Sequence, residues 1–404
     1  MTPWSLVAGD PPRDRLDAIG LVALLVLVAA VQLSIALSSA AVAVLLLAWA
    51  AGLAARRERP GIPALFWPLA VYAGLTLVSA LLSYDRVESL VDSRQLLLLL
   101  VVPATFDLAR GRRAHTVLTV VITVGAVSAA IGIFQYGVLH LDWLRNRVHG
   151  LLGHYMTYSG LIMLVICAAA ARIVFGRRGR TWAALVMPAL LVALAVTYSR
   201  NAWIGAGAGL AVIFLLRDWR LLFLLPLIAA LFLAVAPPKV TARFYSVFDL
   251  TDVTNRDRFA MAEAGGRIVR DHPLFGVGPN MVLRVYPEYR TARAVEPNQP
   301  HLHNVPLQIA AERGLPALAA WLWFIVTAAR LAWMRVRRDA NRVLPAAALA
   351  SLAAMLAAGM FEHNFGDSEF LILLLVLATL PLAAARGAAA SRRGGPGDPA
   401  ATAA

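Results

Sequence analysis

Long apolar blocks alternate along the chain with short polar segments, without the period-2 or period-3.6 pattern of half-buried strands and helices. A helix needs about 20 apolar residues to cross a bilayer. The blocks therefore predict an all-α, polytopic integral membrane protein with about twelve transmembrane helices. We expect these spans at 17–37, 39–55, 62–82, 95–110, 115–138, 154–175, 181–198, 201–216, 221–236, 314–333, 343–361 and 369–386.

The composition excludes an ordinary soluble domain. Hydrophobic residues make up 60% of the 404 positions, charged residues only 15%, and the mean hydropathy is +0.70. Soluble domains have about 45–50% apolar and about 25% charged residues. Cys167 is the single cysteine and lies inside an apolar block, so the sequence contains neither a disulfide framework nor a thiolate metal site.

Basic clusters occupy every second loop between the predicted spans. By the positive-inside rule these loops and both termini are cytoplasmic. We therefore expect nine transmembrane helices in 1–236, one long loop on the outer side at 237–313, three helices in 314–386, and a disordered cytoplasmic tail at 387–404. The net charge of +14 reflects this topology, and no nucleic-acid partner is expected. A cleaved signal peptide is the alternative for the N-terminus, but the first block is too long for one.

Polar residues gather on the outer side and leave the spans almost free of charge, which predicts one binding or catalytic face there. A helix is expected at 256–271, ended by His272 because the following proline disfavours helical geometry. Asn304 is a plausible N-cap, Pro306 suits a first turn, and Gly314 suits a C-terminal cap. A short helix should therefore lead into the tenth span.

Three segments in this order resemble the O-antigen ligase and polymerase superfamily. They are TYSRNAWIG at 197–205, RFAMAEAGGRIVRDHPLFGVGPN at 258–280 and HLHNVPLQIAAERGLPAL at 301–318. The predicted spans, with one large outer loop before the tenth, also match this superfamily. The resemblance implies a GT-C-like membrane glycosyltransferase in the bacterial inner membrane, with its active site facing the periplasm.

The same resemblance implies the substrates. Members use undecaprenyl-diphosphate-linked glycans, and the closeness of the HLHN and SRNAW motifs favours an O-antigen ligase that transfers the glycan to lipid A-core. An O-antigen polymerase and a protein O-oligosaccharyltransferase remain alternatives within the superfamily. A lipid-linked sugar transporter or flippase is the alternative from another class, although the sequence shows no repeat of the kind that transporters contain.

Arginines are the candidates for binding the donor diphosphate, because guanidinium groups make bidentate contacts with phosphate oxygens. Arg200 lies between two predicted spans at a helix N-terminus, which itself attracts anions. Arg258 and Arg267 point to opposite faces of a straight helix, so both reach one diphosphate only if the helix breaks at Gly265-Gly266. An ordinary ion pair with Glu263 is the alternative role for Arg267.

His303 is the candidate general base for the acceptor hydroxyl, because histidine titrates near neutral pH. His301 should point to the opposite side of an extended backbone, which makes the pair a poor metal chelate. We therefore expect a reaction without metal or cofactor. Arg200 is a second candidate catalytic residue.

Other outer-side polar residues are candidates for a supporting role. These are Asn304, His301, and Glu362 and Asp367 in the turn between the last two spans. A solvated turn is the simpler interpretation of the last two. An earlier outer loop holds Arg145, Arg147 and His149, which are either contacts for acceptor phosphates or ordinary loop charges.

Overall fold

The computed structural model describes residues 11–143, 146–247, 249, 252–292 and 294–393. The described residues are 77% helical. Within the described residues, the strands form one short antiparallel hairpin, β1 (Asp142–Trp143) and β2 (Asn146–Arg147), in which Asp142 pairs with Arg147. The fold is therefore nearly all-α, which confirms the helical class predicted from the apolar blocks.

The helices of the first part of the chain are α2 (Arg15–Ala30), α3 (Ile35–Arg56), α4 (Phe66–Leu81), α5 (Arg86–Asp92), η1 (Ser93–Leu100), α6 (Val101–Leu108), α7 (Arg113–Gly137), α8 (Tyr155–Phe175), α9 (Arg180–Val196), α10 (Arg200–Arg217), η2 (Trp219–Phe223) and α11 (Leu224–Val235). They are followed by α12 (Pro238–Tyr245), α13 (Val253–Asp271), α14 (Val282–Tyr289), α15 (Val305–Arg338), α16 (Val343–Gly359), η3 (Asn364–Gly366) and α17 (Ser368–Arg393).

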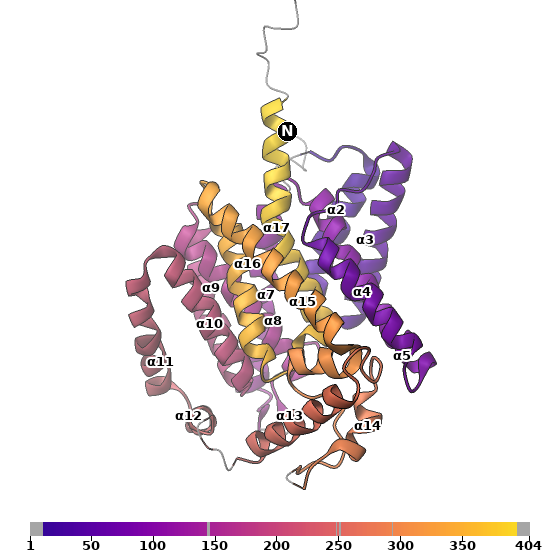
Figure 1. The fold of residues 1–404 in the computed structure, drawn as a ribbon. Coiled ribbons are helices and arrows are strands. Elements are labelled where there is room, and N and C mark those ends of the chain that lie inside the picture. Colours follow the sequence, from indigo (N-terminus) through magenta and orange to yellow (C-terminus); the bar gives the residue numbers. More distant parts are fainter. Residues whose placement is uncertain (1–10, 144–145, 248, 250–251, 293, 394–404) are drawn as a thin grey trace, which may run out of the picture.

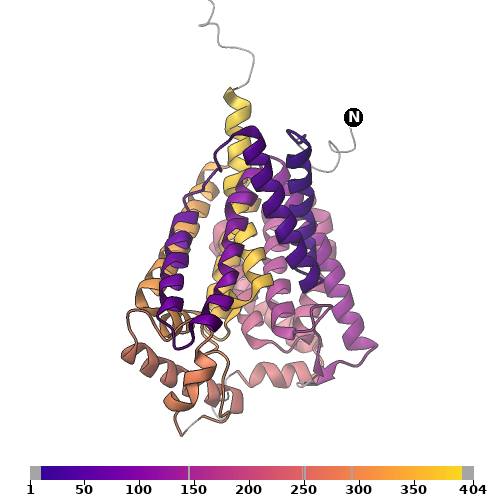
Figure 2. The same cartoon turned by 90° about the vertical axis from the view of Figure 1, so that its right-hand side faces the viewer.

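The long helices form one bundle, with α12, α13 and α14 gathered at one end of it (Figure 1; Figure 2). We call this end the outer end, and the opposite one, where α7, α9 and α16 begin, the arginine-rich end. Helix α16 packs against α8, α10, α15 and α17, and one continuous apolar core links these elements. A second, smaller apolar cluster joins α13, α14 and the start of α15 at the outer end.

Six helical segments are long and apolar enough to cross a membrane: Ile35–Arg56, Arg86–Leu108, Arg113–Gly137, Tyr155–Phe175, Val305–Arg338 and Ser368–Arg386. They make the chain a multi-pass membrane protein. The predicted spans at 62–82, 181–198, 221–236 and 343–361 correspond to shorter apolar helices of 10–17 residues. Length and composition therefore do not establish the predicted number of about twelve spans.

Several predicted boundaries were wrong. The first two helices are separated at 31–34, earlier than expected, because the Ser34 hydroxyl caps α3 by accepting a hydrogen bond from the Leu37 amide. The span predicted from residue 95 begins at Arg86, since the Asp85 carboxylate caps α5. Helix α17 continues to Arg393, so 387–393 is helical where a disordered tail was expected, and 394–404 lies outside the described residues.

Helix α15 begins and breaks where its sequence predicted. The Asn304 carboxamide caps it by accepting from the Leu307 amide at 2.9 Å, and a proline occupies its first turn. Gly314 interrupts the helix with φ 83° and ψ 169°, a conformation that is essentially restricted to glycine. Likewise, α13 ends at Asp271, directly before His272 and its proline. The short helix predicted before the tenth span is confirmed.

The glycine-rich turn at 273–278 completes this helix break. The Val277 amide donates to the Ala311 carbonyl and the Gly278 amide to the Glu312 carbonyl, both at 2.9 Å. In the other direction, the Leu315 amide donates to the Pro273 carbonyl at 2.8 Å. The last carbonyls of a helix have no hydrogen-bond donor within that helix, and the amides of this turn supply the donors. A Cβ on Gly314 would lie 2.1 Å from the Leu274 carbonyl oxygen.

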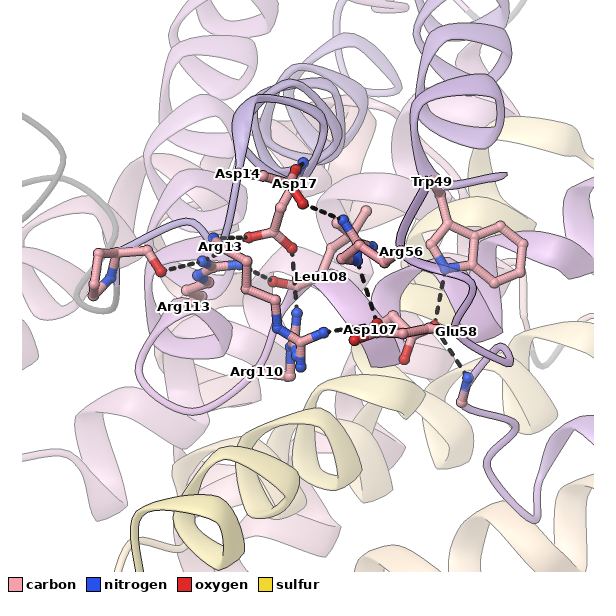
Figure 3. Close-up of polar contacts among 12 residues, drawn as sticks. Arg13, Asp14, Asp17, Trp49, Arg56, Glu58, Asp107, Leu108, Arg110 and Arg113 are labelled. Atoms are coloured by element: carbon pink, nitrogen blue, oxygen red, sulfur yellow. Dashed lines mark hydrogen bonds and ion pairs between the residues drawn. The ribbon is translucent and has the colours of Figure 1, made fainter. Parts of the chain in front are cut away.

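The arginine-rich end contains an ion-pair network (Figure 3). Asp17 on α2 accepts from Arg113 at 2.9 Å and from Arg110 at 3.2 Å, and the side chains of Asp17 and Arg113 are only 1% and 3% exposed. Asp107 accepts from the Trp49 indole at 2.9 Å and pairs with Arg386. These pairs fasten α2, α3, α6, α7 and α17 to one another.

Replacing Gly314 by alanine should destabilise the protein by about 3 kcal/mol or more, because the backbone conformation is strained for other residues and the new Cβ would collide with the turn. Gly74→Ala is the matched control: its Cβ meets nothing within 4 Å, and alanine should stabilise α4 by about 0.5–1 kcal/mol. Thermal unfolding in detergent measures both, and equal effects would contradict the assigned helix break.

Asp17→Asn should lower the free energy of unfolding by about 3–5 kcal/mol, because it leaves the buried Arg113 guanidinium without its counter-charge. Glu58→Gln removes an exposed carboxylate, 45% exposed, that pairs with Arg13 and Arg56. This control should cost less than about 1 kcal/mol. A comparable loss of thermal stability in the two variants would show that the Asp17 pair does not fasten the bundle.

Candidate active site

Two loops at the outer end bring a histidine and a carboxylate together. His303 stands directly before the N-cap of α15, and its Nδ1 lies 3.0 Å from Oε2 of Glu362, which follows α16. The Asn304 carboxamide donates to the Met360 carbonyl at 3.1 Å and so ties the same two loops together. The Glu362 side chain is 8% exposed, whereas the His303 side chain is 18% exposed. The imidazole is therefore fixed by the carboxylate and still accessible.

The Glu362 carboxylate is ionised. Burial raises its pKa, but the hydrogen bond from His303 and, when the imidazoles are protonated, the charges of His303 and His301 outweigh burial and lower the pKa to about 2. An ionised carboxylate can only accept, so His303 donates through Nδ1. Its Nε2 is then the nitrogen that carries a free lone pair and can take a proton.

His301 lies on the same side as His303, contrary to the sequence prediction. The two ring centroids are 4.5 Å apart, and His301 Nε2 lies 3.7 Å from Glu362 Oε1. The reason is the backbone of His303, which has φ 48° and so is not extended. Burial, with a smaller effect of the His303 charge, lowers the pKa of His301, which favours its neutral form.

This geometry could also hold a metal ion. One ligand atom from each of His301, His303 and Glu362 lies within 4.8 Å of the others. Two imidazoles and a carboxylate are a ligand set that Zn²⁺ accepts. The argument that excluded a chelate on spacing alone was therefore wrong, and the expectation of a metal-free reaction remains a prediction.

Arg200, the first residue of α10, is buried and bound by the chain itself. Its guanidinium donates to the carbonyl and the hydroxyl of Ser246 at 2.8 and 3.1 Å, and to Asp252 and Asn255 at 3.2 and 3.1 Å. These contacts hold the segment between α12 and α13 against α10. Arg200 therefore acts on the site by placing that segment and by adding its positive charge.

Three further arginines lie within electrostatic reach of Arg200, and the four together, Arg147, Arg200, Arg243 and Arg258, are called the arginine cluster. Burial lowers the pKa of Arg243 to about 10, and the charges of Arg200 and Arg147 contribute despite Asp252 nearby. The pKa of Arg258 is lowered by burial and by Arg200, although Glu362 opposes this. Burial is the main cause for both pKa values, and the neighbouring arginines add to it.

The arginine cluster adjoins the His303–Glu362 pair through Arg258. Its guanidinium carbon lies 5.8 Å from the ring centroid of Phe361, the neighbour of Glu362. The Nε of Arg243 is buried without a hydrogen-bond partner among the described residues. On the other flank, the Arg147 guanidinium stacks over Tyr155 at 4.3 Å. The His303–Glu362 pair and the arginine cluster therefore lie next to each other.

Arg267 does not join the cluster. Helix α13 runs unbroken through Gly265-Gly266, because Gly265 packs against Leu307, whose Cδ2 would lie 2.6 Å from an added Cβ. The break at these glycines, which Arg258 and Arg267 would need in order to reach one diphosphate together, does not occur. Arg267 instead donates to Glu263 at 2.8 Å, with both side chains more than 40% exposed. The structure therefore shows the ion pair with Glu263 that was the alternative prediction for Arg267.

Asp367 lines a cavity together with Glu362. The Thr157 hydroxyl donates to Asp367, the Phe370 amide donates to its Oδ1 at 3.0 Å, and burial raises its pKa. The cavity, of about 230 Å³, is lined among others by His154, Asn201, His301, Glu362 and Asp367. Asp367 thus fastens α17 to α8 and closes one wall beside the His303–Glu362 pair.

Sequence reasoning missed Arg243 and left Arg147 undecided. Arg243 lies on α12, in a segment with no motif around it, and its position beside Arg200 arises only from the fold. The proximity of Arg147 to the cluster depends on the β1–β2 hairpin. Glu362 was named in the sequence among several acids of one turn, but its contact with His303 was not predicted.

Comparison with known proteins identifies the central part of the chain. Residues 185–322 match a family model described as O-Antigen ligase. This range contains Arg200, Arg243, Arg258 and His303. None of the curated proteins compared with the chain matches it.

Arg258→Gln should weaken the binding of inorganic pyrophosphate to the purified protein by about tenfold or more, because a charge-assisted hydrogen bond contributes about 1.5–3 kcal/mol. Arg267→Gln, on the same helix, should leave binding within about twofold of wild type, because that guanidinium is exposed and faces away from the cluster. Isothermal titration calorimetry measures both, and equal losses would contradict the assignment of the cluster.

Proposed function

The chain is a member of the O-antigen ligase/polymerase superfamily, and on this basis we propose that it is an O-antigen ligase. It transfers O-antigen glycan from undecaprenyl diphosphate to lipid A-core on the periplasmic face of the inner membrane. The observation that supports this proposal is the His303–Glu362 pair beside the arginine cluster. Sugar transfer from a diphosphate requires an anion site near a proton acceptor.

The arginine cluster serves the leaving group. As the bond between the anomeric carbon and the diphosphate oxygen breaks, its electron pair stays on the diphosphate, whose negative charge increases. Arg258 and Arg243 are placed to neutralise that charge, and fixed positive groups in a site with little water do so without reorganising. Arg200 donates to Ser246 at the end of α12, the helix of Arg243, and to Asn255 on α13, the helix of Arg258.

His303 serves the acceptor. The attacking sugar hydroxyl gives its proton to Nε2 of His303, while its oxygen forms the new bond to the anomeric carbon from the side opposite the diphosphate. One displacement of this kind inverts the anomeric centre. Glu362 accepts from Nδ1, fixes the ring orientation, and stabilises the imidazolium that forms.

A reconstituted reaction tests the activity. Purified protein in liposomes is mixed with undecaprenyl-diphosphate-linked O-antigen and lipid A-core in the presence of EDTA, and ligated lipopolysaccharide is detected on a gel. We expect product without added metal or nucleotide. Chain extension without attachment to lipid A-core would identify a polymerase, movement of the donor without a covalent product would identify a flippase, and loss of activity in EDTA would show that a metal is needed.

His303→Ala should reduce the rate of ligation by about 10²–10⁴-fold, because the acceptor hydroxyl loses its general base. Glu362→Gln should give an intermediate rate, since the base remains but its orientation and charge are less well supported. His140→Asn is the control: His140 is exposed on an outer loop with φ 53°, a conformation that asparagine tolerates. A His303 variant with the wild-type rate at equal expression would refute the assigned role.

A further inference from the structure

A large cavity opens at the arginine-rich end, away from the active site. Its volume is about 980 Å³, and it is formed by the start of α7, the end of α8, the start of α9 and the turn before α16. Arg112, Arg172, Arg177 and Arg178 line it together with His115 and Trp182. No aspartate or glutamate is among its described lining residues. The cavity is therefore strongly positive.

Arg172 is the feature of this cavity that requires explanation. It lies in the last turn of α8 and is only 5% exposed. Its guanidinium donates to the Thr119 hydroxyl at 2.6 Å and to the His115 carbonyl at 3.1 Å, which are both neutral acceptors. Within the described residues no carboxylate lies within ion-pair distance of it. Helix carbonyls at the end of α8 offset only part of a buried charge.

Arg113, at the same end of the molecule, provides a comparison. It is as deeply buried as Arg172, but Asp17 accepts from it at 2.9 Å and supplies a full counter-charge. A buried guanidinium is costly unless it is paired. The chain pairs Arg113 internally, whereas the counter-charge for Arg172 must come from outside the described chain.

The cavity also borders an exposed apolar surface of α9. The Trp182 indole donates to Thr123 at 3.1 Å and is 40% exposed. One turn further along α9, Leu185 is 70% exposed. A partly exposed tryptophan at the end of an apolar helix, followed by an exposed leucine, is typical of the boundary between headgroups and acyl chains.

We propose that this cavity binds an anionic phospholipid. The lipid phosphate pairs with Arg172, and the exposed Arg177 and Arg178 close over it. One acyl chain leaves past Trp182 and lies along Leu185. By the positive-inside rule the lipid belongs to the cytoplasmic leaflet, whose basic interhelical pockets are suited to phosphate headgroups. The site is independent of the proposed sugar transfer.

Native mass spectrometry of the detergent-purified full chain tests the proposal. Dioleoyl phosphatidylglycerol is titrated against dioleoyl phosphatidylcholine, which has the same acyl chains but no net charge, and against inorganic phosphate. We expect phosphatidylglycerol to bind at least tenfold more tightly than either. Equal binding of the two lipids would refute recognition of the anionic headgroup, and inorganic phosphate binding as tightly as phosphatidylglycerol would refute a lipid site.

Two variants locate the site. Arg177→Gln/Arg178→Gln changes only exposed side chains and should weaken phosphatidylglycerol binding about tenfold to thirtyfold. Arg172→Gln should weaken it further. The control, Arg217→Gln/Arg220→Gln, removes two exposed charges at the same end but outside the cavity, and should retain wild-type affinity. Wild-type affinity in the first double variant, or an equal loss in the control, would overturn the proposal.

Discussion

Burying guanidinium groups in an apolar bundle is the constraint that organises both ends of this molecule. A buried charge is tolerated when a counter-charge lies beside it, and the arginines of this chain differ in whether the chain itself supplies one. Arg113 has its own carboxylate partner in Asp17, and the contact joins helices. Arg172 and Arg258 lack a matching carboxylate within ion-pair distance among the described residues. Internally matched arginines hold the fold together, and unmatched ones mark surfaces that suit anions.

The structure of the outer end also depends on the break in α15. Because Gly314 breaks α15, the first nine residues of that helix form a separate short element, and the turn at 273–278 satisfies its last carbonyls. That element carries Asn304 at its N-terminus and therefore fixes where His303 stands. A backbone requirement at one end of the short helix thus positions the proposed base at the other end.

The types of neighbouring residues in the sequence predicted the short helix at the start of α15 well, but they predicted the candidate site only in part. The N-cap at Asn304, the stop before His272 and the break at Gly314 follow from side chains adjacent in sequence, and each was predictable. The side on which His301 points was not, because it depends on the left-handed backbone of His303. The helix predicted at 256–271 agrees with α13, but the sequence left open whether it breaks at Gly265-Gly266. Gly265 lies against Leu307 of another helix, a contact that no local pattern shows.

The two motif segments that flank this site differ in what they contribute. In the turn at 273–278 the glycines are needed for positive φ and for close approach to α15, so this motif is architectural. In the segment at 301–304 the imidazoles of His301 and His303 lie against each other and against Glu362, so the side chains of this motif form the candidate site. The positive charges of the site lie outside these two segments, because Arg200, Arg243 and Arg258 come from three different helices. A sequence motif that contains one of these arginines therefore describes only part of the arginine cluster, because the cluster forms only when the chain folds.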